Sequence, residues 1–170
     1  EVHVVEAADG ATTDLIDPCT GNGRPNPVPF FDNLDVPFIE RMDEAGYRPE
    51  DVDFVVCTHL HHDHCGWNTR LRGGKWVPTF PNARYIMQRA EYDRWGSARG
   101  SHPEIAYNDG VFERSVQPIV EAGLADLVSG SLCLTDGLQV EAAPGHTVGH
   151  QMVRLASDGS HAFFTGDCFH

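Results

Sequence analysis

The sequence predicts one domain of an α/β fold, with strands packed inside and helices outside. Apolar segments of strand length alternate with segments of helical spacing, and three strands end in a turn that carries a histidine or an aspartate. Strand patterns occur at 2–7, 12–16, 52–57, 84–88, 131–134, 138–143, 151–155 and 161–165. Helical spacing occurs at 36–45, 89–95 and 111–122. A chain of 170 residues can bury a core of this kind, so we expect a single domain over 1–170.

Proline and glycine mark the connections in the first half of the chain. Residues 18–29 form a long loop rich in both. Long loops in compact domains are often functional, so we expect this one to line the entrance to a site. The helix at 36–45 has apolar residues at 36, 38, 39, 42 and 45, and Gly46 ends it. The apolar run at 52–57 follows and predicts a buried strand.

The second half begins with residues 66–81, which follow no clear period. We expect an irregular stretch there with exposed aromatic side chains at Trp67, Trp76 and Phe80. Trp67 is expected either to wall a pocket or to serve in packing. Gly123 closes the helix at 111–122, and Ser-Asp-Gly-Ser at 157–160 predicts a hairpin between the last two strands.

The residues at 59–64 read His-Leu-His-His-Asp-His, directly after the strand pattern at 52–57. Simple packing does not require four candidate ligands at the spacing of His59, His61, Asp63 and His64. In an extended chain His59 and His61 point the same way and could converge on one metal ion. Asp63 and His64 could reach a second ion once the chain turns. His62 points away from its neighbours, so we expect it to support a ligand or to face solvent.

Two later strands also end in turns that carry a possible metal ligand. Pro-Gly-His-Thr places His146 after the strand at 138–143, and Thr-Gly-Asp places Asp167 after the strand at 161–165. Each motif alone is a weak signal, because glycine turns are common. Their shared form is stronger, since loops at strand ends are where rigid scaffolds carry binding residues.

Together these motifs resemble the metallo-β-lactamase-fold hydrolases, whose pattern is His-x-His-x-Asp-His, then a later His and a later Asp. The resemblance covers most of the chain and implies a four-layer αββα sandwich with the site at one edge. It also implies two divalent metal ions. The first ion would be held by His59, His61 and His146. The second would be held by Asp63, His64 and the bridging Asp167.

The ligands implied by this resemblance suit hydrolysis. Zn²⁺ is the expected ion, although Mn²⁺, Fe²⁺ or Co²⁺ fits the same mixed nitrogen and oxygen set. Two dications about 3.5–4 Å apart would share a water and lower its pKa, so that a metal-bridging hydroxide attacks the substrate. Asp63 would also orient that hydroxide. The resemblance therefore implies a dinuclear metallohydrolase acting on ester-type bonds.

Two positions discriminate within the family. Redox-active diiron relatives carry Glu in place of the second histidine, and His61 stands there in this chain. The best-known β-lactamase group lacks the histidine after the aspartate, so His64 points to lactonase or type II glyoxalase relatives. We expect a lactone or related small ester as substrate. The alternatives are a β-lactam, a thioester or a phosphotriester at the same site, or a metal-binding protein without turnover.

Dinuclear members of the family carry one further histidine some tens of residues after the bridging aspartate, whereas this sequence ends at His170. We expect the sequence to be the N-terminal portion of a longer chain, with the fold truncated in its second half. The alternative is that His170 takes the place of the missing ligand. Without that ligand, the second metal would bind more weakly than the first.

The net charge and the hydropathy of the chain limit its possible partners. The chain has 12 Lys and Arg against 25 Asp and Glu, a formal charge of −13, which argues against nucleic acid as a partner. No apolar run is long enough to cross a membrane. We therefore expect only a small-molecule substrate as partner. The sequence does not decide the oligomeric state.

The number and spacing of the cysteines indicate the cellular compartment of the protein. The five cysteines, an odd number without a CxxC pair, predict a reducing compartment, and we expect a cytoplasmic protein. The sequence begins without Met and inside a strand pattern, so we expect it to be clipped there, and a secretory leader could have preceded it. Cys65 and Cys168 follow two candidate ligands. We expect them either to be small buried apolar residues or to approach the metals or each other.

Overall fold

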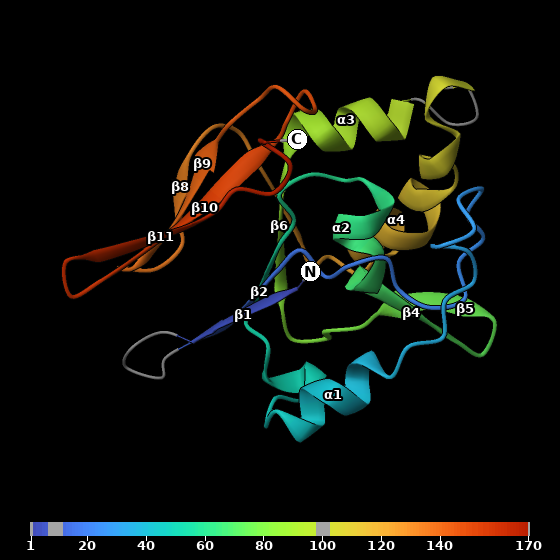
Figure 1. Cartoon of the computed structure of the whole chain (residues 1–170), viewed down its shortest axis with the longest axis horizontal. Helices are drawn as coiled ribbons and strands as arrows, with labels where there is room; N and C mark the ends of the chain where they lie inside the picture. Colours follow the sequence, from blue (N-terminus) through green and yellow to red (C-terminus); the bar gives the residue numbers. More distant parts are fainter. Residues whose placement is uncertain (1, 7–11, 98–102, 170) are drawn as a thin grey trace.

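The computed structural model describes residues 2–6, 12–97 and 103–169, and these form two facing sheets with helices on one side (Figure 1). The five-stranded sheet has the order β1-β2-β3-β6-β7 and the four-stranded sheet the order β11-β10-β9-β8. The first sheet consists of β1 (His3–Glu6), β2 (Thr13–Ile16), β3 (Phe54–Val56), β6 (Arg84–Gln88) and β7 (Ala125–Val128). The second consists of β8 (Leu132–Cys133), β9 (Leu138–Ala142), β10 (Gln151–Ser157) and β11 (Ser160–Phe164).

Strands β2, β3, β6 and β7 run parallel, and their apolar runs are buried on both faces. Consecutive residues of a strand point to opposite sides. Leu15 therefore enters the core beneath the helices, whereas Ile16 enters the core between the two sheets. In the same way, Val55 enters the core beneath the helices and Val56 enters the core between the two sheets. This double burial explains why the strands read as continuous apolar runs and not as alternating ones.

Helices cover the outer face of the five-stranded sheet. They are α1 (Phe38–Glu44), α2 (His62–Cys65), α3 (Arg89–Ser97) and α4 (Gln117–Glu121), with 3₁₀ turns at Pro49–Asp51, Gly66–Asn68 and Pro103–Asn108. Met42, Trp95 and Ile119 bring three of these helices into the core beneath that face. The order is helix, sheet, sheet, so the predicted α/β sandwich is confirmed for these three layers. Within the described ranges, no helix covers the outer face of the four-stranded sheet.

Three segments differ from the sequence prediction. Residues expected to be irregular at 66–81 contain a hairpin, β4 (Thr69–Arg72) with β5 (Lys75–Pro78). The helix expected at 111–122 begins as a π-helical turn, Phe112–Val116, before α4. Strand β7 begins at Ala125, where no strand was expected. Short elements of four or five residues carry too few periods for a sequence pattern to identify them.

The aromatic residues of 66–81 are not exposed as predicted. Phe80 and Trp67 are buried, and Trp67 stacks on Phe38 with ring centroids 4.8 Å apart. Trp67 therefore has the packing role. Trp76 is half-buried because the guanidinium of Arg24 lies 4.1 Å from its ring centroid. The predicted exposure failed because segments distant in sequence cover these rings: Phe38 of α1 covers Trp67, and Arg24 of the long loop covers Trp76.

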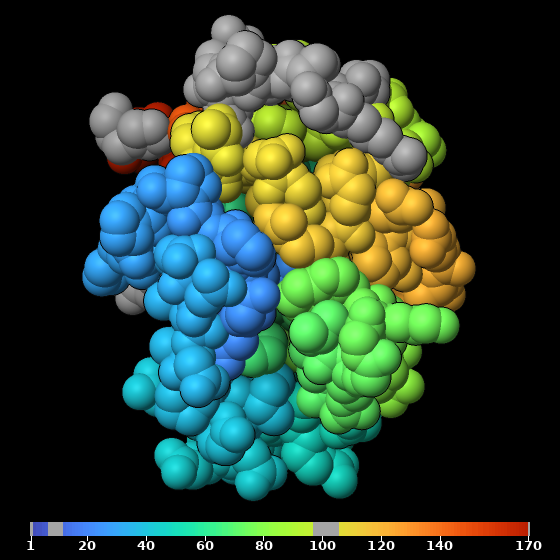
Figure 2. Space-filling view, turned by 90° about the vertical axis from the view of Figure 1, so that its right-hand side faces the viewer, coloured from blue at the N-terminus to red at the C-terminus, as the bar shows by residue number. Residues whose placement is uncertain are grey.

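That loop is anchored on both sides. The buried Arg24 donates from Nη2 to the carbonyl oxygens of Gly66 and Thr69, the latter at 2.8 Å. Asn26 donates from Nδ2 to the carbonyl oxygen of Tyr107 at 3.1 Å. Figure 2 shows the resulting face, where the blue loop lies beside the yellow segment that contains Tyr107. The loop is thus a fixed wall of the molecule.

Asp14 makes stability depend on pH. Its carboxyl is buried with one oxygen unpartnered, and burial raises its pKa from 3.8 to about 6, with Asp53 adding to the rise. Below about pH 4 the Asp14 carboxyl is protonated in both the folded and the unfolded state, so it does not lower the free energy of unfolding. As the pH rises toward 6 the unfolded state loses this proton more readily, and the free energy of unfolding falls. We expect Asp14→Asn to raise the unfolding free energy above pH 6 by up to about 3 kcal/mol, and to change little at pH 3.5.

Urea unfolding at pH 3.5 and pH 7.5 measures this difference. The exposed Asp43→Asn serves as the control, because its carboxylate lies in water in both states. An equal effect of Asp14→Asn at both pH values would show that the Asp14 carboxyl does not titrate as inferred.

Candidate metal centre

The histidine motif occupies the turn between β3 and α2. The strand ends at Val56, the chain bends at Thr58, His59 and His61, and α2 begins at His62. The carboxyl ends of β3 and β11 meet at this edge of the sandwich, together with the loop between β9 and β10. The predicted turn is confirmed, but the segment before it bends and does not stay extended. The motif lies where three strand connections converge.

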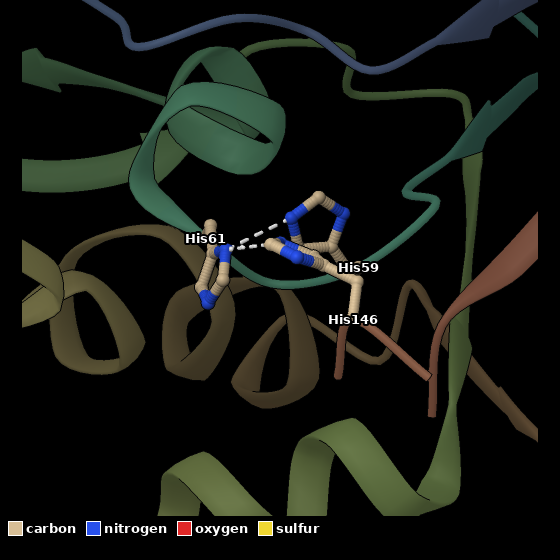
Figure 3. A group of neighbouring side chains, drawn as sticks. All are labelled: His59, His61 and His146. Carbon is tan, nitrogen blue, oxygen red and sulfur yellow. Dashed lines mark hydrogen bonds between the residues drawn. The ribbon is translucent and has the colours of Figure 1, made fainter. Parts of the chain in front are cut away.

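Three imidazoles meet at this edge. Nδ1 of His61 lies 3.0 Å from Nε2 of His59 and 3.1 Å from Nε2 of His146. Their rings are mutually nearly perpendicular, so the three nitrogens face one common point (Figure 3). His59 and His61 are buried, whereas the loop of His146 is exposed. The structure thus brings together the three residues predicted for the first ion.

A second group lies on the other side of His59. The nearest nitrogen–oxygen pair joins Nε2 of His64 to Oδ1 of Asp167 at 3.3 Å. Oδ2 of Asp167 lies 3.5 Å from Nε2 of His146 and 4.0 Å from Nε2 of His59. Asp167 therefore contacts both groups, as a bridging ligand must. The atoms that gather closely here belong to His59, His64 and Asp167.

Asp63 lies at the rim of this second group. Its Oδ2 is 3.7 Å from Nε2 of His64, and its side chain is 38% exposed. Asp63 does not belong to the closest set of donor atoms in this group, which consists of His59, His64 and Asp167. Its predicted role as a ligand that also orients water stays a prediction.

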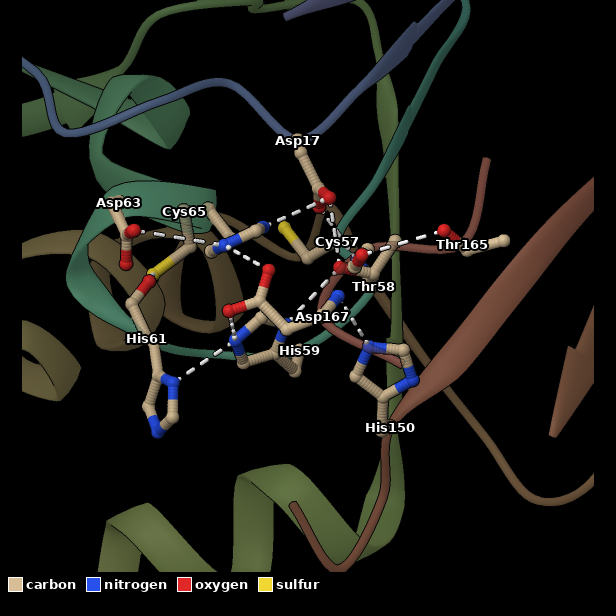
Figure 4. Close-up of polar contacts among 12 residues, drawn as sticks. Asp17, Cys57, Thr58, His59, His61, Asp63, Cys65, His150, Thr165 and Asp167 are labelled. Atoms are coloured by element: carbon tan, nitrogen blue, oxygen red, sulfur yellow. Dashed lines mark hydrogen bonds and ion pairs between the residues drawn. The ribbon is translucent and has the colours of Figure 1, made fainter. Parts of the chain in front are cut away.

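Asp17 fixes two of the candidate ligands, and sequence reasoning did not identify it. Its buried carboxylate accepts hydrogen bonds from the amide of Thr58 at 2.7 Å and from the hydroxyl of Thr58 at 2.8 Å (Figure 4). It also lies 2.9 Å from Nδ1 of His64. Because the Thr58 hydroxyl donates to Asp17, it accepts from Nδ1 of His59, 3.1 Å away. Both Nε2 atoms are then left as lone-pair donors.

His150 fixes Asp167. Its Nε2 accepts a hydrogen bond from the backbone amide of Asp167 at 3.2 Å (Figure 4). Gly166 makes this approach possible, because a Cβ there would lie 2.6 Å from the Thr58 hydroxyl and its φ is +50°. The motif Pro-Gly-His-Thr-Val-Gly-His contains this second histidine, so its spacing was the available signal.

Electrostatics favour the neutral form of His59 and His61. Burial and the neighbouring imidazoles lower the pKa of His59 strongly, and burial together with His146 lowers that of His61 to about 4. For His64, burial lowers the pKa, but the hydrogen bond to Asp17 and nearby carboxylates outweigh it, so the net shift is upward. Neutral imidazoles with converging lone pairs are the state that a metal cation requires.

The donor set fits a divalent ion. In a tetrahedral site with Zn–N bonds of about 2.0–2.1 Å, neighbouring nitrogens lie about 3.3 Å apart. The observed spacings of 3.0 and 3.1 Å are close to that value. One shared proton cannot satisfy three facing acceptors, whereas one cation can. His59, His61 and His146 could therefore hold one ion, and His64 with Asp167 could contribute to a second.

Other predicted residues have different surroundings. His62 is buried, with its ring 4.8 Å from that of Phe31, so it does not face solvent. Cys65 is buried, its Sγ donates to the His61 carbonyl oxygen at 3.2 Å, and burial raises its pKa to about 12. Sγ of Cys168 lies 3.5 Å from Nδ1 of His150. All five cysteines are free, and His170 lies outside the described residues.

Cavities flank the candidate centre. One of about 650 Å³ is lined by Asp63, His64 and Asp167 together with Phe31 and Phe164. Another of about 510 Å³ is lined by residues around His61 and His146, including Trp95, Tyr107 and Val148. Volumes of about 300–1,000 Å³ are typical of small-molecule sites. Cys19 and Thr20 also line the first cavity, which places the start of the long loop at the site as predicted.

Facing sheets with a histidine and aspartate cluster at their edge define a class of α/β sandwich suited to metal binding. The family profile described as Metallo-beta-lactamase superfamily matches residues 2–170. The chain belongs to this superfamily, and the resemblance inferred from its motifs is confirmed.

Individual relatives agree. An N-acyl homoserine lactonase of Bacillus cereus is 27% identical over 119 residues, which are 70% of this chain and 39% of that protein. A probable metal-dependent hydrolase from Staphylococcus aureus superimposes with a TM-score of 0.74 at 22% identity, over 96% of this chain and 56% of the other. A dizinc quorum-quenching lactonase gives a TM-score of 0.68 at 21% identity, over 98% and 55%.

The chain thus spans about two fifths of the length of the curated relative and little more than half of the solved chains. The solved structures support the fold. No helix within the described ranges has the length and hydropathy that crossing a membrane requires.

Proposed function

We propose that the protein is a metal-dependent hydrolase that opens a lactone or cleaves a related small ester. The observation that carries this proposal is the convergence of three histidines, in which Nδ1 of His61 lies 3.0 Å from Nε2 of His59 and 3.1 Å from Nε2 of His146, with Asp167 beside them. The relative from Bacillus cereus bears the name N-acyl homoserine lactonase. That name and the cavity volumes support a small-molecule substrate.

Divalent ions bound here would lower the pKa of a coordinated water and polarise the substrate carbonyl, which supplies the nucleophile and activates the ester. The side chains of the protein do the rest. We assign to Asp63 the orientation of the attacking water, because its carboxylate is partly exposed beside His64. Burial, Asp63 and Asp167 raise the pKa of Tyr107, so its hydroxyl keeps its proton and can donate to a substrate oxygen.

The cavity beside His61 offers an apolar wall. Trp95 lies with its ring centroid 5.5 Å from that of His61, and Val148 is 58% exposed in the adjoining loop. An acyl chain could cover these surfaces and gain from the removal of apolar area from water. The acidic net charge disfavours polyanionic substrates.

A substrate panel tests this proposal. We expect a metal-loaded preparation to hydrolyse an N-acyl homoserine lactone faster than a thioester, a β-lactam or a phosphotriester. Chelation should abolish the activity and added Zn²⁺ should restore it. A faster rate on another member of the panel would overturn the substrate assignment. Full metal loading without hydrolysis of any member would instead favour a metal-binding protein without turnover.

A further inference from the structure

We propose that Glu91 is a positioning residue that holds the two loops of the three-histidine group against each other. Glu91 lies on α3, outside all the motifs that predicted the site, and only 1% of it is exposed. Its carboxylate accepts hydrogen bonds from both ligand-bearing loops. The inference rests on the proposed metal site and adds a residue that determines its geometry.

The first contact fixes the His59 loop. Oε2 of Glu91 accepts from the backbone amide of Leu60 at 3.2 Å. The carbonyl oxygen of Leu60 accepts from Nδ2 of the buried Asn108 at 3.0 Å. Leu60 separates His59 from His61, so the two peptide planes on either side of it are each held. Rotation about the backbone of Leu60 would change the angle between the two imidazoles, and these bonds oppose it.

The second contact fixes the His146 loop. Oε1 of Glu91 accepts from the backbone amide of Gly149 at 2.8 Å. A Cβ at Gly149 would lie 2.8 Å from the Glu91 amide nitrogen and 2.9 Å from its Cγ, so only glycine permits this approach. The turn before Gly149 is closed by its own bonds, because the Thr147 carbonyl oxygen accepts from Gly145 at 3.0 Å. Holding Gly149 therefore holds His146.

The third contact reaches a ligand ring. Nε1 of Trp95 donates to Oε2 of Glu91 at 3.0 Å, and the indole packs edge-on against His61. Three N–H groups thus point at one carboxylate from three segments. A carboxylate is the group that can only accept, whereas a glutamine would turn an NH₂ toward one of these donors. Glu91 is therefore matched to this place by charge and by hydrogen-bond polarity.

Metal affinity tests this role without relying on turnover. Purified protein is stripped with chelator and titrated with Co²⁺, and the visible absorption of the bound ion gives the dissociation constant and the ligand geometry. Residues that hold ligands in place typically change metal affinity about 10–100-fold when replaced. We expect Glu91→Gln to raise the Co²⁺ dissociation constant by that factor and to alter the absorption band, with unchanged far-UV circular dichroism.

The control is Asp93→Asn, an equally small change on the exposed face of the same helix, and it should bind Co²⁺ as the unmodified protein does. Gly149→Ala gives a second measurement that keeps the carboxylate and moves the loop, and it should weaken binding as well. Unchanged Co²⁺ affinity and spectrum in Glu91→Gln or in Gly149→Ala would overturn the inference alone. Absence of Co²⁺ binding by the unmodified protein would overturn the proposed metal site.

Discussion

Replacing His59 by alanine is expected to remove metal from both groups and to reduce hydrolysis by several orders of magnitude. The reason is its central position. Its Nε2 lies 3.0 Å from Nδ1 of His61, and its ring centroid lies 4.1 Å from that of His64. His59 is also a member of each of the closest donor sets in the described residues. His146 belongs to one of these sets, so His146→Ala should deplete one ion more than the other.

Metal analysis by mass spectrometry and lactone hydrolysis measure this outcome together. His59 is buried, so its truncation also leaves a cavity, and circular dichroism must show that the variant is folded. His161→Ala is the matched control, because His161 is exposed on β11 and should keep full metal and activity. A folded His59→Ala variant with normal turnover and full metal content would refute the site.

The ligand pattern could be read from sequence because it is local and periodic. His59 and His61 are two positions apart directly after a strand, and the turn at α2 brings His64 around, so elementary backbone geometry predicts their convergence even though the segment bends. His146 and Asp167 were found because each follows a strand and a glycine. The parallel strands could be predicted for a similar reason. A strand that is buried on both faces is a continuous apolar run, which can be recognised in the sequence without knowing the neighbouring strands.

The supporting residues could not be read in this way. Asp17 contacts His64 across 47 positions of sequence, and Glu91 contacts Leu60 across 31. Asp17 at the end of a strand and Glu91 in a helix are single carboxylates, and neither belongs to a sequence motif that would identify its partners. Their roles depend on which elements pack side by side, and that is a property of the sheet order. The same reason explains why the exposure of Trp67 and Trp76 was predicted wrongly, because their partners Phe38 and Arg24 are distant in sequence.

Asp167→Asn is expected to uncouple the two ions. The exchange keeps the size of the side chain but removes one negative charge between His64 and His146, whose Nε2 atoms lie 3.3 and 3.5 Å from its oxygens. The amide keeps one neutral oxygen and replaces the other by an NH₂ group, which cannot bind a cation, so it should bridge two cations much more weakly than the carboxylate. We expect metal content to fall from about two ions per chain toward one, with a large loss of hydrolysis, since shared-water activation needs both ions.

Asp158→Asn is the control for this exchange. Asp158 occupies the hairpin between β10 and β11 at a φ of 47°, a conformation that asparagine tolerates well, so its metal content and activity should not change. The backbone amide of Asp167 is bonded to His150, so the loop should keep its place in the Asp167 variant. Equal and tight loading of two ions in Asp167→Asn would show that another group bridges them.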